Sequence, residues 1–139
     1  MRARLLSLCL LIFIPTLALA QDIPGYTNLS FDPGHGTQIE YISPEGGAYL
    51  WYPGNSVILP GRWKLDDGRM CFAYGPNTYN PVTGTSGGDW ECASVAFYFR
   101  PITERAKGDV LGLQGRGRVP FDLPREQTSL AEIAKLIRR

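Results

Sequence analysis

The stretch RWKLDDGRMCFAY, residues 62–74, decides the fold. Residues 62–65 alternate between charged and apolar side chains, which is typical of a half-buried strand. Asp67 and Gly68 follow, and an Asp-Gly pair between two such runs favours a type I′ turn, because both central residues of that turn need positive φ. We therefore predict an antiparallel hairpin in which residues 69–74 return alongside residues 62–65.

Further strand candidates lie on both sides of this hairpin. Residues 37–43, 48–52 and 57–59 contain many β-forming residues, and turns that contain Pro and Gly separate them. Residues 90–100 (WECASVAFYFR) are the longest candidate. Residues 21–36 are dense in Gly, Pro, Asn and Asp without any period, which indicates a lead-in segment made of turns.

The composition changes after Pro101. Gly and Pro punctuate residues 102–125, and we predict no strand there apart from one edge strand at most within residues 110–121. Ser129 and Glu132 then form a capping box. The apolar residues that follow share one stripe of a short helix, which needs a surface to pack on: Leu130, Ile133, Ala134 and Ile137.

These elements predict a mainly β fold. We expect a small antiparallel sheet curled toward a partial barrel or sandwich, plus a short C-terminal α-helix. The predicted β-rich domain covers residues 21–125, and the amphipathic helix covers residues 126–139.

The first twenty residues have the pattern of a signal peptide. Arg2 and Arg4 precede an apolar stretch, and Ala18 and Ala20 fit a cleavage site. We predict that residues 1–20 are removed and that the protein is periplasmic or secreted. No stable membrane span is expected afterwards, because a spanning helix needs roughly 20 apolar residues.

Cys71 and Cys92 are the two cysteines left after residue 20. Two thiols in a small exported domain usually pair, and the bond would stabilise the fold by roughly 3 kcal/mol on the chain-entropy model. Zinc binding is the rival interpretation, but zinc needs three or four ligands, and the chain has one histidine, His35. If residues 69–74 and 90–100 are neighbours, both cysteines face one side and the following apolar residues face the other: Phe72, Tyr74, Val95, Phe97 and Phe99.

The charge is divided unevenly along the chain. Residues 21–99 hold three basic and eight acidic residues, whereas residues 100–139 hold nine basic and five acidic ones. The basic C-terminal part either lies on the acidic body, is simply solvated, or contacts an anionic surface or an acidic partner.

Residues suited to catalysis are few. His35 lies in a Gly- and Pro-rich turn, and both remaining thiols are expected to be oxidised, so no nucleophile and base pair is evident. Asp66 and Asp67 are explained by turn chemistry, and Asp89 with Glu91 by a loop and a strand edge. We therefore expect no catalytic residues, no metal and no cofactor.

The loop between the two cysteines supplies the binding candidates. Residues 75–89 are predicted to form a long, partly ordered connection, and such connections are often functional. Tyr79 and Asn80 are the candidate contacts for a partner, because binding residues concentrate on loops held by a rigid scaffold. Alternatively, Tyr79 folds back over the sheet and only closes the core.

Three short elements carry a resemblance. G-x-W at Gly61 to Trp63, C-F-x-Y at Cys71 to Tyr74 and W-x-C at Trp90 to Cys92 are similar to a pattern in small exported proteobacterial proteins of unknown function. The resemblance covers about a third of the chain. It implies a periplasmic or secreted β-domain with one disulfide, and it brings no catalytic residue with it.

We therefore expect a non-enzymatic binding or interaction protein of the bacterial envelope. An envelope protein or a glycan is the expected partner, nucleic acid is not, and the protein is expected to be a monomer. A small carboxylate-dependent hydrolase and a purely structural envelope protein are the alternatives.

Overall fold

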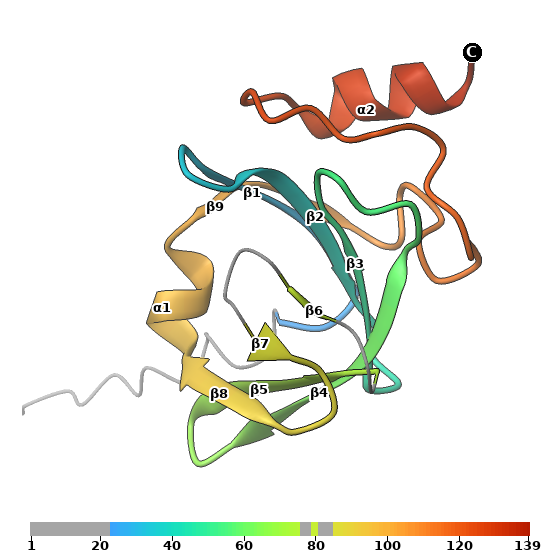
Figure 1. The fold of residues 1–139 in the computed structure, drawn as a ribbon. Helices are drawn as coiled ribbons and strands as arrows, with labels where there is room; N and C mark the ends of the chain where they lie inside the picture. The colour runs from blue at the N-terminus through green and yellow to red at the C-terminus, as the bar shows by residue number, and fades with distance from the viewer. Residues whose placement is uncertain (1–22, 76–78, 81–84) are drawn as a thin grey trace, which may run out of the picture.

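In the computed structural model, residues 23–75, 79–80 and 85–139 are described, and the predicted signal peptide lies outside them. Seven strands in this part of the chain form one antiparallel sheet that curls like half of a barrel (Figure 1). Their order across the sheet is β8 (Glu91–Ser94), β5 (Arg69–Tyr74), β4 (Leu59–Asp66), β3 (Gly47–Trp51), β2 (Gly36–Ile42), β1 (Tyr26–Asp32) and β9 (Ile102–Lys107). The predicted fold class is thus confirmed.

The central hairpin forms as predicted. Strands β4 and β5 pair from Gly61 with Tyr74 to Asp66 with Arg69. Asp67 and Gly68 have φ of 50° and 70°, as a type I′ turn requires. Strand β4 starts at Leu59, so residues 57–59 do not form a separate strand. Residues 57 and 58 precede β4, and Leu59 is its first residue.

The prediction of one strand over residues 90–100 is wrong. Strand β8 ends at Ser94, and residues 95–99 form the short helix α1 (Val95–Phe99). Ser94 caps this helix, because its Oγ accepts a hydrogen bond of 3.1 Å from the Phe97 amide. The helix turns Phe97 outward, where it is 58% exposed, and turns Tyr98 inward. A short apolar run does not by itself distinguish a strand from a helix.

Two further strands were not predicted. Strand β1 lies within the segment interpreted as turns, and it pairs with β2 along its whole length. Strand β9 covers the charged sequence ITERAK and pairs with β1 at the edge of the sheet. Pairing with a neighbour overrides the weak β propensity of such residues. Within residues 110–121 the structure has only an isolated bridge, between Val57 and Arg118.

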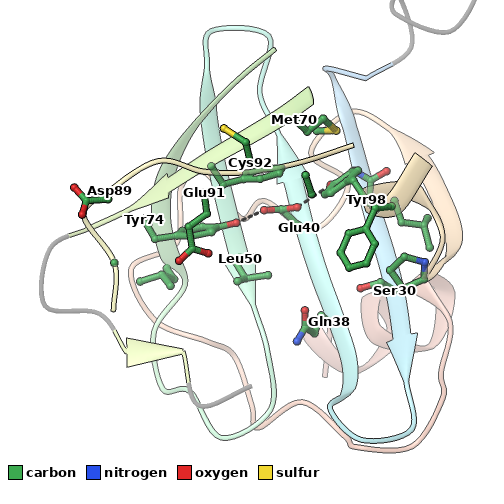
Figure 2. A pocket seen from close by; sticks show the side chains of 18 residues that line it. Ser30, Gln38, Glu40, Leu50, Met70, Tyr74, Asp89, Glu91, Cys92 and Tyr98 are labelled. Atoms are coloured by element: carbon green, nitrogen blue, oxygen red, sulfur yellow. Dashed lines mark hydrogen bonds between the residues drawn. The ribbon is translucent and has the colours of Figure 1, made fainter. Parts of the chain in front are cut away.

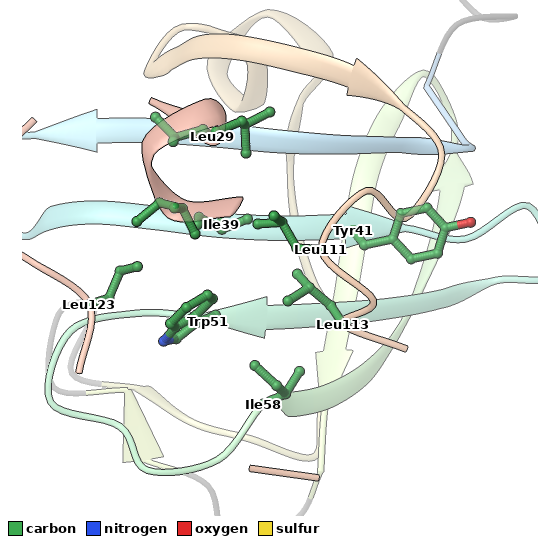
Figure 3. Close-up of a cluster of buried hydrophobic side chains, with 10 residues drawn as sticks. Leu29, Ile39, Tyr41, Trp51, Ile58, Leu111, Leu113 and Leu123 are labelled. Atoms are coloured by element: carbon green, nitrogen blue, oxygen red, sulfur yellow. The ribbon is translucent and has the colours of Figure 1, made fainter. Parts of the chain in front are cut away.

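The main hydrophobic core lies on the outer, convex face of the sheet (Figure 3). Leu29, Ile39 and Trp51 point outward from β1, β2 and β3 and are fully buried. The chain after β9 covers them, with buried side chains from the loop and from the C-terminal helix: Leu111, Leu113, Leu123, Leu130 and Ile133.

The C-terminal helix α2 (Leu130–Ile137) is confirmed, and Ser129 Oγ accepts from the Glu132 amide at 3.2 Å. Its docking face is also as predicted, since Leu130 and Ile133 are buried and Ile137 packs on the same core. Two hydrogen bonds fix α2 and the segment before it to the sheet. The Leu130 amide donates to a carboxylate oxygen of β9, and Thr37 Oγ1 donates to a carbonyl of the covering chain at 2.7 Å.

The inner, concave face carries a different set of side chains. A second cluster at one end contains Ile42 from β2, Ala48 from β3 and Met70 from β5, and partly buried rings pack against it. Next to this cluster the inward residues of β1 and β2 are polar. Strands β1, β2 and β3 therefore have a mainly apolar outer row and a mixed inner row, following the period of two.

The connection between β5 and β8 contains a small second sheet. Strand β6 (Tyr79–Asn80) pairs with β7 (Thr85–Ser86) in antiparallel register. The predicted loop of residues 75–89 therefore contains some regular structure, while residues 76–78 and 81–84 lie outside the described residues. None of the helices in the described part of the chain is long and apolar enough to cross a membrane.

Candidate functional site

A cavity of about 400 Å³ occupies the concave face of the half-barrel (Figure 2). Its floor comes from β1 to β5, and one side comes from β8 and α1. This volume lies in the range of about 300–1,000 Å³ that is usual for small-molecule sites. The cavity is therefore large enough for a ligand well beyond the size of a water molecule.

Glu40 on β2 lies in this cavity between two tyrosines, as the dashed lines in Figure 2 show. Tyr74 of β5 donates its phenol hydrogen to Glu40 Oε1. Tyr98 of α1 donates to Glu40 Oε2 at 2.7 Å. Three elements that are distant in sequence thus converge on one carboxyl group.

The hydrogen bonds continue from Tyr98 to the edge strand. Asn28 Nδ2 donates to the Tyr98 hydroxyl oxygen at 3.3 Å, and Arg105 Nε donates to Asn28 Oδ1 at 2.8 Å. The guanidinium of Arg105 also lies over the ring of Tyr26, 4.2 Å from its centroid. A connected network of this kind fixes the orientation of each member.

Burial changes the acidity of these groups. Desolvation raises the pKa of Glu40 above its ordinary value, and the hydrogen bonds from Tyr74 and Tyr98 oppose that rise. Burial, followed by the nearby Glu40 carboxyl, raises the pKa of both tyrosines well above the usual value. Both phenols therefore keep their protons at neutral pH and act as donors.

Apolar and aromatic side chains form much of the remaining wall. Leu50, Leu59 and Met70 line it from neighbouring strands. The ring of Phe72 stacks on that of Tyr98 with centroids 5.3 Å apart, so the wall includes packed aromatic rings. Such walls bind apolar groups, while a few polar atoms fix the orientation of a ligand.

Two more carboxylates, those of Asp89 and Glu91, line the same cavity, and both residues are exposed. They therefore lie where the cavity meets solvent, whereas Glu40 lies deeper. Among the described residues that line the cavity, the three charged ones are all acidic. The described residues contain no cluster of three or more His, Cys, Asp or Glu that could hold a metal ion.

Gly61 makes room for one of the two tyrosines. It faces Tyr74 across the hairpin, and a Cβ atom placed on Gly61 would come within 2.6 Å of the Tyr74 ring. Any larger residue at position 61 would push this ring from its place beside Glu40. The lack of a side chain at Gly61, the glycine of the G-x-W element, is thus what allows the Tyr74 ring to lie beside Glu40.

The Cys71–Cys92 disulfide, predicted from the sequence, is present in the structure. The two cysteines lie directly opposite each other on β5 and β8. The bond therefore joins β8, and the helix α1 that follows it, to the rest of the sheet. It holds in place the segment that presents Tyr98 to Glu40.

The predicted division of side chains around the disulfide is mostly correct. Phe72, Tyr74, Val95 and Phe99 pack in one cluster on the inner face. Phe97 does not join them, because α1 replaces the predicted strand and rotates Tyr98 into the inward position.

The three sequence elements of the resemblance lie together in space. The C-F-x-Y element supplies Phe72 and Tyr74 to the cavity wall. Trp90 of the W-x-C element lies under two side chains of β4, with Arg62 and Lys64 at 5.1 and 5.0 Å from its ring centroid. These contacts place the start of β8 against the central hairpin.

The structure places the backbone of Tyr79 and Asn80 in β6, paired with Ser86 and Thr85 of β7. Their side chains lie outside what the structure describes, so these two residues stay candidates. The chain leaving β7 leads directly to Gly87 and Asp89, which line the cavity.

Sequence reasoning missed the centre of the site. Gln38 and Glu40 alternate with Ile39 and Tyr41, which resembles a strand with one face in solvent. Here the apolar row faces the covered outer side, and the polar row faces the cavity. The sequence contained one signal for which face of the sheet is covered. Residues 130–137 are strongly apolar, which implied that the helix packs on one face of the sheet.

Comparisons of the chain with protein-family models, with curated protein sequences and with solved structures gave no match. The residues of the cavity therefore provide the basis for a function.

Proposed function

We propose that this protein is a non-enzymatic binding protein of the bacterial envelope that holds a small ligand, or a small group of a larger envelope partner, in its concave cavity. The observation that carries the proposal is a half-buried carboxyl group, held by two phenols, inside a cavity with apolar and aromatic walls. Proteins recognise small molecules with such a combination of apolar surface and few oriented polar groups.

The site is organised before any ligand arrives. Glu40, Tyr74 and Tyr98 are held by their mutual hydrogen bonds, and Asn28 and Arg105 support Tyr98 from behind. A site of this kind loses little conformational entropy when a ligand binds. The disulfide contributes by fixing α1.

The position in the envelope is supported by two features. Residues 1–20 have the pattern of a signal peptide. The disulfide between Cys71 and Cys92 is a bond that persists in oxidising compartments.

The carboxylate-dependent hydrolase is the second candidate, because Glu40 and Glu91 line the same cavity and Glu40 has the raised pKa of a general acid. The hydrogen bonds argue against it. Both Glu40 oxygens already accept a phenol hydrogen, which favours a fixed acceptor over a group that passes its proton to a substrate.

Binding of the neutral dye Nile red tests the proposal. Its fluorescence rises in apolar surroundings, and we expect saturable binding to the wild-type protein. Ala93 lines the cavity, so Ala93→Phe should fill part of it and weaken binding about tenfold or more. Ala96→Phe is the matched control, because Ala96 is exposed on α1 and does not line the cavity.

The outcome separates the possibilities. Loss of binding in Ala93→Phe with unchanged binding in Ala96→Phe supports the cavity as the site. Equal binding by the two variants, or no saturable binding by the wild-type protein, contradicts the proposal. Release of product from a panel of glycosides, lost in Glu40→Gln, would favour the hydrolase instead.

A further inference from the structure

We infer that the cavity selects a ligand with a positively charged amine head and an apolar body, whose ammonium group lies against Glu40. This inference rests on the proposed function, since it names the chemical class of the ligand for the same cavity. It is drawn from the charges that line the cavity and from the partners of Glu40.

The described charged side chains that line the cavity all have the same sign. Glu40, Asp89 and Glu91 line the cavity, and no Lys, Arg or His does so among the described residues. A recess lined by one sign of charge concentrates ions of the opposite sign at its mouth. An anionic ligand would meet three carboxylates along the lining, where a nearby cation is Arg100, whose guanidinium lies over the ring of Phe97 at 5.0 Å from the centroid.

The hydrogen bonds to Glu40 in the described part of the chain come from no Lys, Arg or His. Its two hydrogen-bond donors, Tyr74 and Tyr98, are neutral phenols. Two ion pairs that join described side chains, His35 with Asp32 and Lys64 with Asp66, lie away from Glu40. Buried carboxylates in proteins are usually paired with a cation. A ligand ammonium would supply that cation inside the cavity, beside the Glu40 carboxyl.

The walls of the cavity suit a cation that carries an apolar body. Aromatic rings of Phe72, Tyr74 and Tyr98 lie around the Glu40 carboxyl, and the faces of such rings attract cations. Leu50, Leu59 and Met70 offer apolar surface beyond them. A purely inorganic cation would leave this surface without a partner, which is why we infer an apolar body.

Phe97 extends the apolar surface to the opening. It lines the cavity and is 58% exposed, so it lies where a ligand would enter. The exposed Asp89 and Glu91 lie at the opening as well. The same opening thus offers an apolar contact together with two negative charges.

Three probes with one apolar body test the inference: phenylbutylamine, phenylbutanol and phenylbutyrate, which carry a cationic, a neutral and an anionic head. Calorimetry on the oxidised protein at neutral pH would measure each affinity. We expect the amine to bind about tenfold or more tightly than the alcohol, as a charge-assisted hydrogen bond to a carboxylate implies, and the carboxylate to bind most weakly.

Glu40→Gln removes the charge and keeps the shape of the side chain. We expect it to bring the affinities of the amine and the alcohol together while the alcohol still binds. Chemical shifts of the Phe72, Ala93 and Tyr98 amides report whether each probe occupies the cavity. The comparison of the three probes on the wild-type protein does not depend on the folding of the variant.

Equal affinity for the amine and the alcohol, or preference for the carboxylate, would overturn the inference and leave the cavity as a binding site. If none of the probes shifts the amides of the cavity and Nile red also fails to bind, the proposed function falls as well. Tight binding of the amine that survives in Glu40→Gln would also contradict the inference, because Glu40 would not be its partner.

Discussion

Tyr98 donates a hydrogen bond of 2.7 Å to Glu40, although 58 residues separate the two in the chain. One lies on the short helix α1 and the other on β2, in the middle of the sheet. The bond therefore joins α1, which follows β8, to the centre of the half-barrel, and its removal should affect both stability and the cavity.

Tyr98→Phe removes this donor and keeps the ring. We expect a loss of about 1–3 kcal/mol in the free energy of unfolding, since a buried acceptor loses a hydrogen-bond partner. Urea unfolding at neutral pH measures it. Tyr49→Phe is the matched control, because Tyr49 packs against the outer core and is not part of the network. A loss of the same size in both variants would contradict the role of the bond.

Glu40→Gln should change how stability depends on pH. Because burial raises the pKa of Glu40 in the folded protein, the folded state holds this proton more tightly than the unfolded chain. The stability gained from the proton is fully present below the ordinary pKa of glutamate and is lost as the pH rises through the raised value.

We therefore expect the wild-type protein to lose stability relative to Glu40→Gln as the pH rises above about 4.5, until Glu40 is ionised in both states. The groups that face Glu40 are the phenols of Tyr74 and Tyr98, which stay protonated over this range, and Asp89 and Glu91 share its cavity. Urea unfolding of both proteins at a series of pH values measures the difference. A constant difference, or one of opposite sign, would refute this account.

Gly61→Ala should disturb the site although Gly61 is not a member of the hydrogen-bond network around Glu40. A methyl group at this position would lie 2.6 Å from the Tyr74 ring and 3.1 Å from the Ala73 carbonyl oxygen. We expect a destabilisation of about 1–3 kcal/mol and weaker binding of Nile red, because the ring must move. Gly117→Ala is the control, since a Cβ there meets no atom within 4 Å. Unchanged binding in Gly61→Ala would show that the hairpin adapts.

Reduction of the disulfide should weaken the whole fold. The intact mass of the exported protein is expected to match residues 21–139 with Cys71 and Cys92 oxidised, and to rise by two hydrogens after reduction. We expect the reduced protein to lose roughly 3 kcal/mol of stability, on the chain-entropy model. Two free thiols after native export, or a mass that includes residues 1–20, would contradict the respective expectation.

Ile133→Ala should open the outer core. Ile133 is fully buried between α2 and the sheet, so we expect a loss of about 2–5 kcal/mol. Leu136→Ala is the control on the same helix, because Leu136 is 40% exposed. Deletion of residues 126–139 should lower the melting temperature further. An unchanged melting temperature would mean that the helix is a free tail.

Local patterns predicted the parts of the fold that local chemistry controls. The Asp67-Gly68 turn and the Ser129 cap each depend on a few neighbouring residues, and the pairing of Cys71 with Cys92 followed from the presence of two cysteines after residue 20. Strands β1 and β9 escaped prediction because their formation depends on pairing across the sheet rather than on their own composition.

The candidate site was harder to predict for a related reason. Glu40 and Tyr98 meet only because the sheet curls and because α1 interrupts the expected strand. A polar residue in a strand is normally assigned to solvent, and the period of two does not reveal which face the rest of the chain will cover. The proposed contacts of Tyr79 and Asn80 remain a prediction.

The segment that covers the convex face is synthesised after all strands of the sheet. All strands of the sheet precede residue 108, whereas Ile133 closes the core. At about 5–20 residues per second, a ribosome would take roughly 1–5 s to add the intervening segment. During that interval the outer side chains of β1 to β3 lack the side chains that bury them in the finished fold.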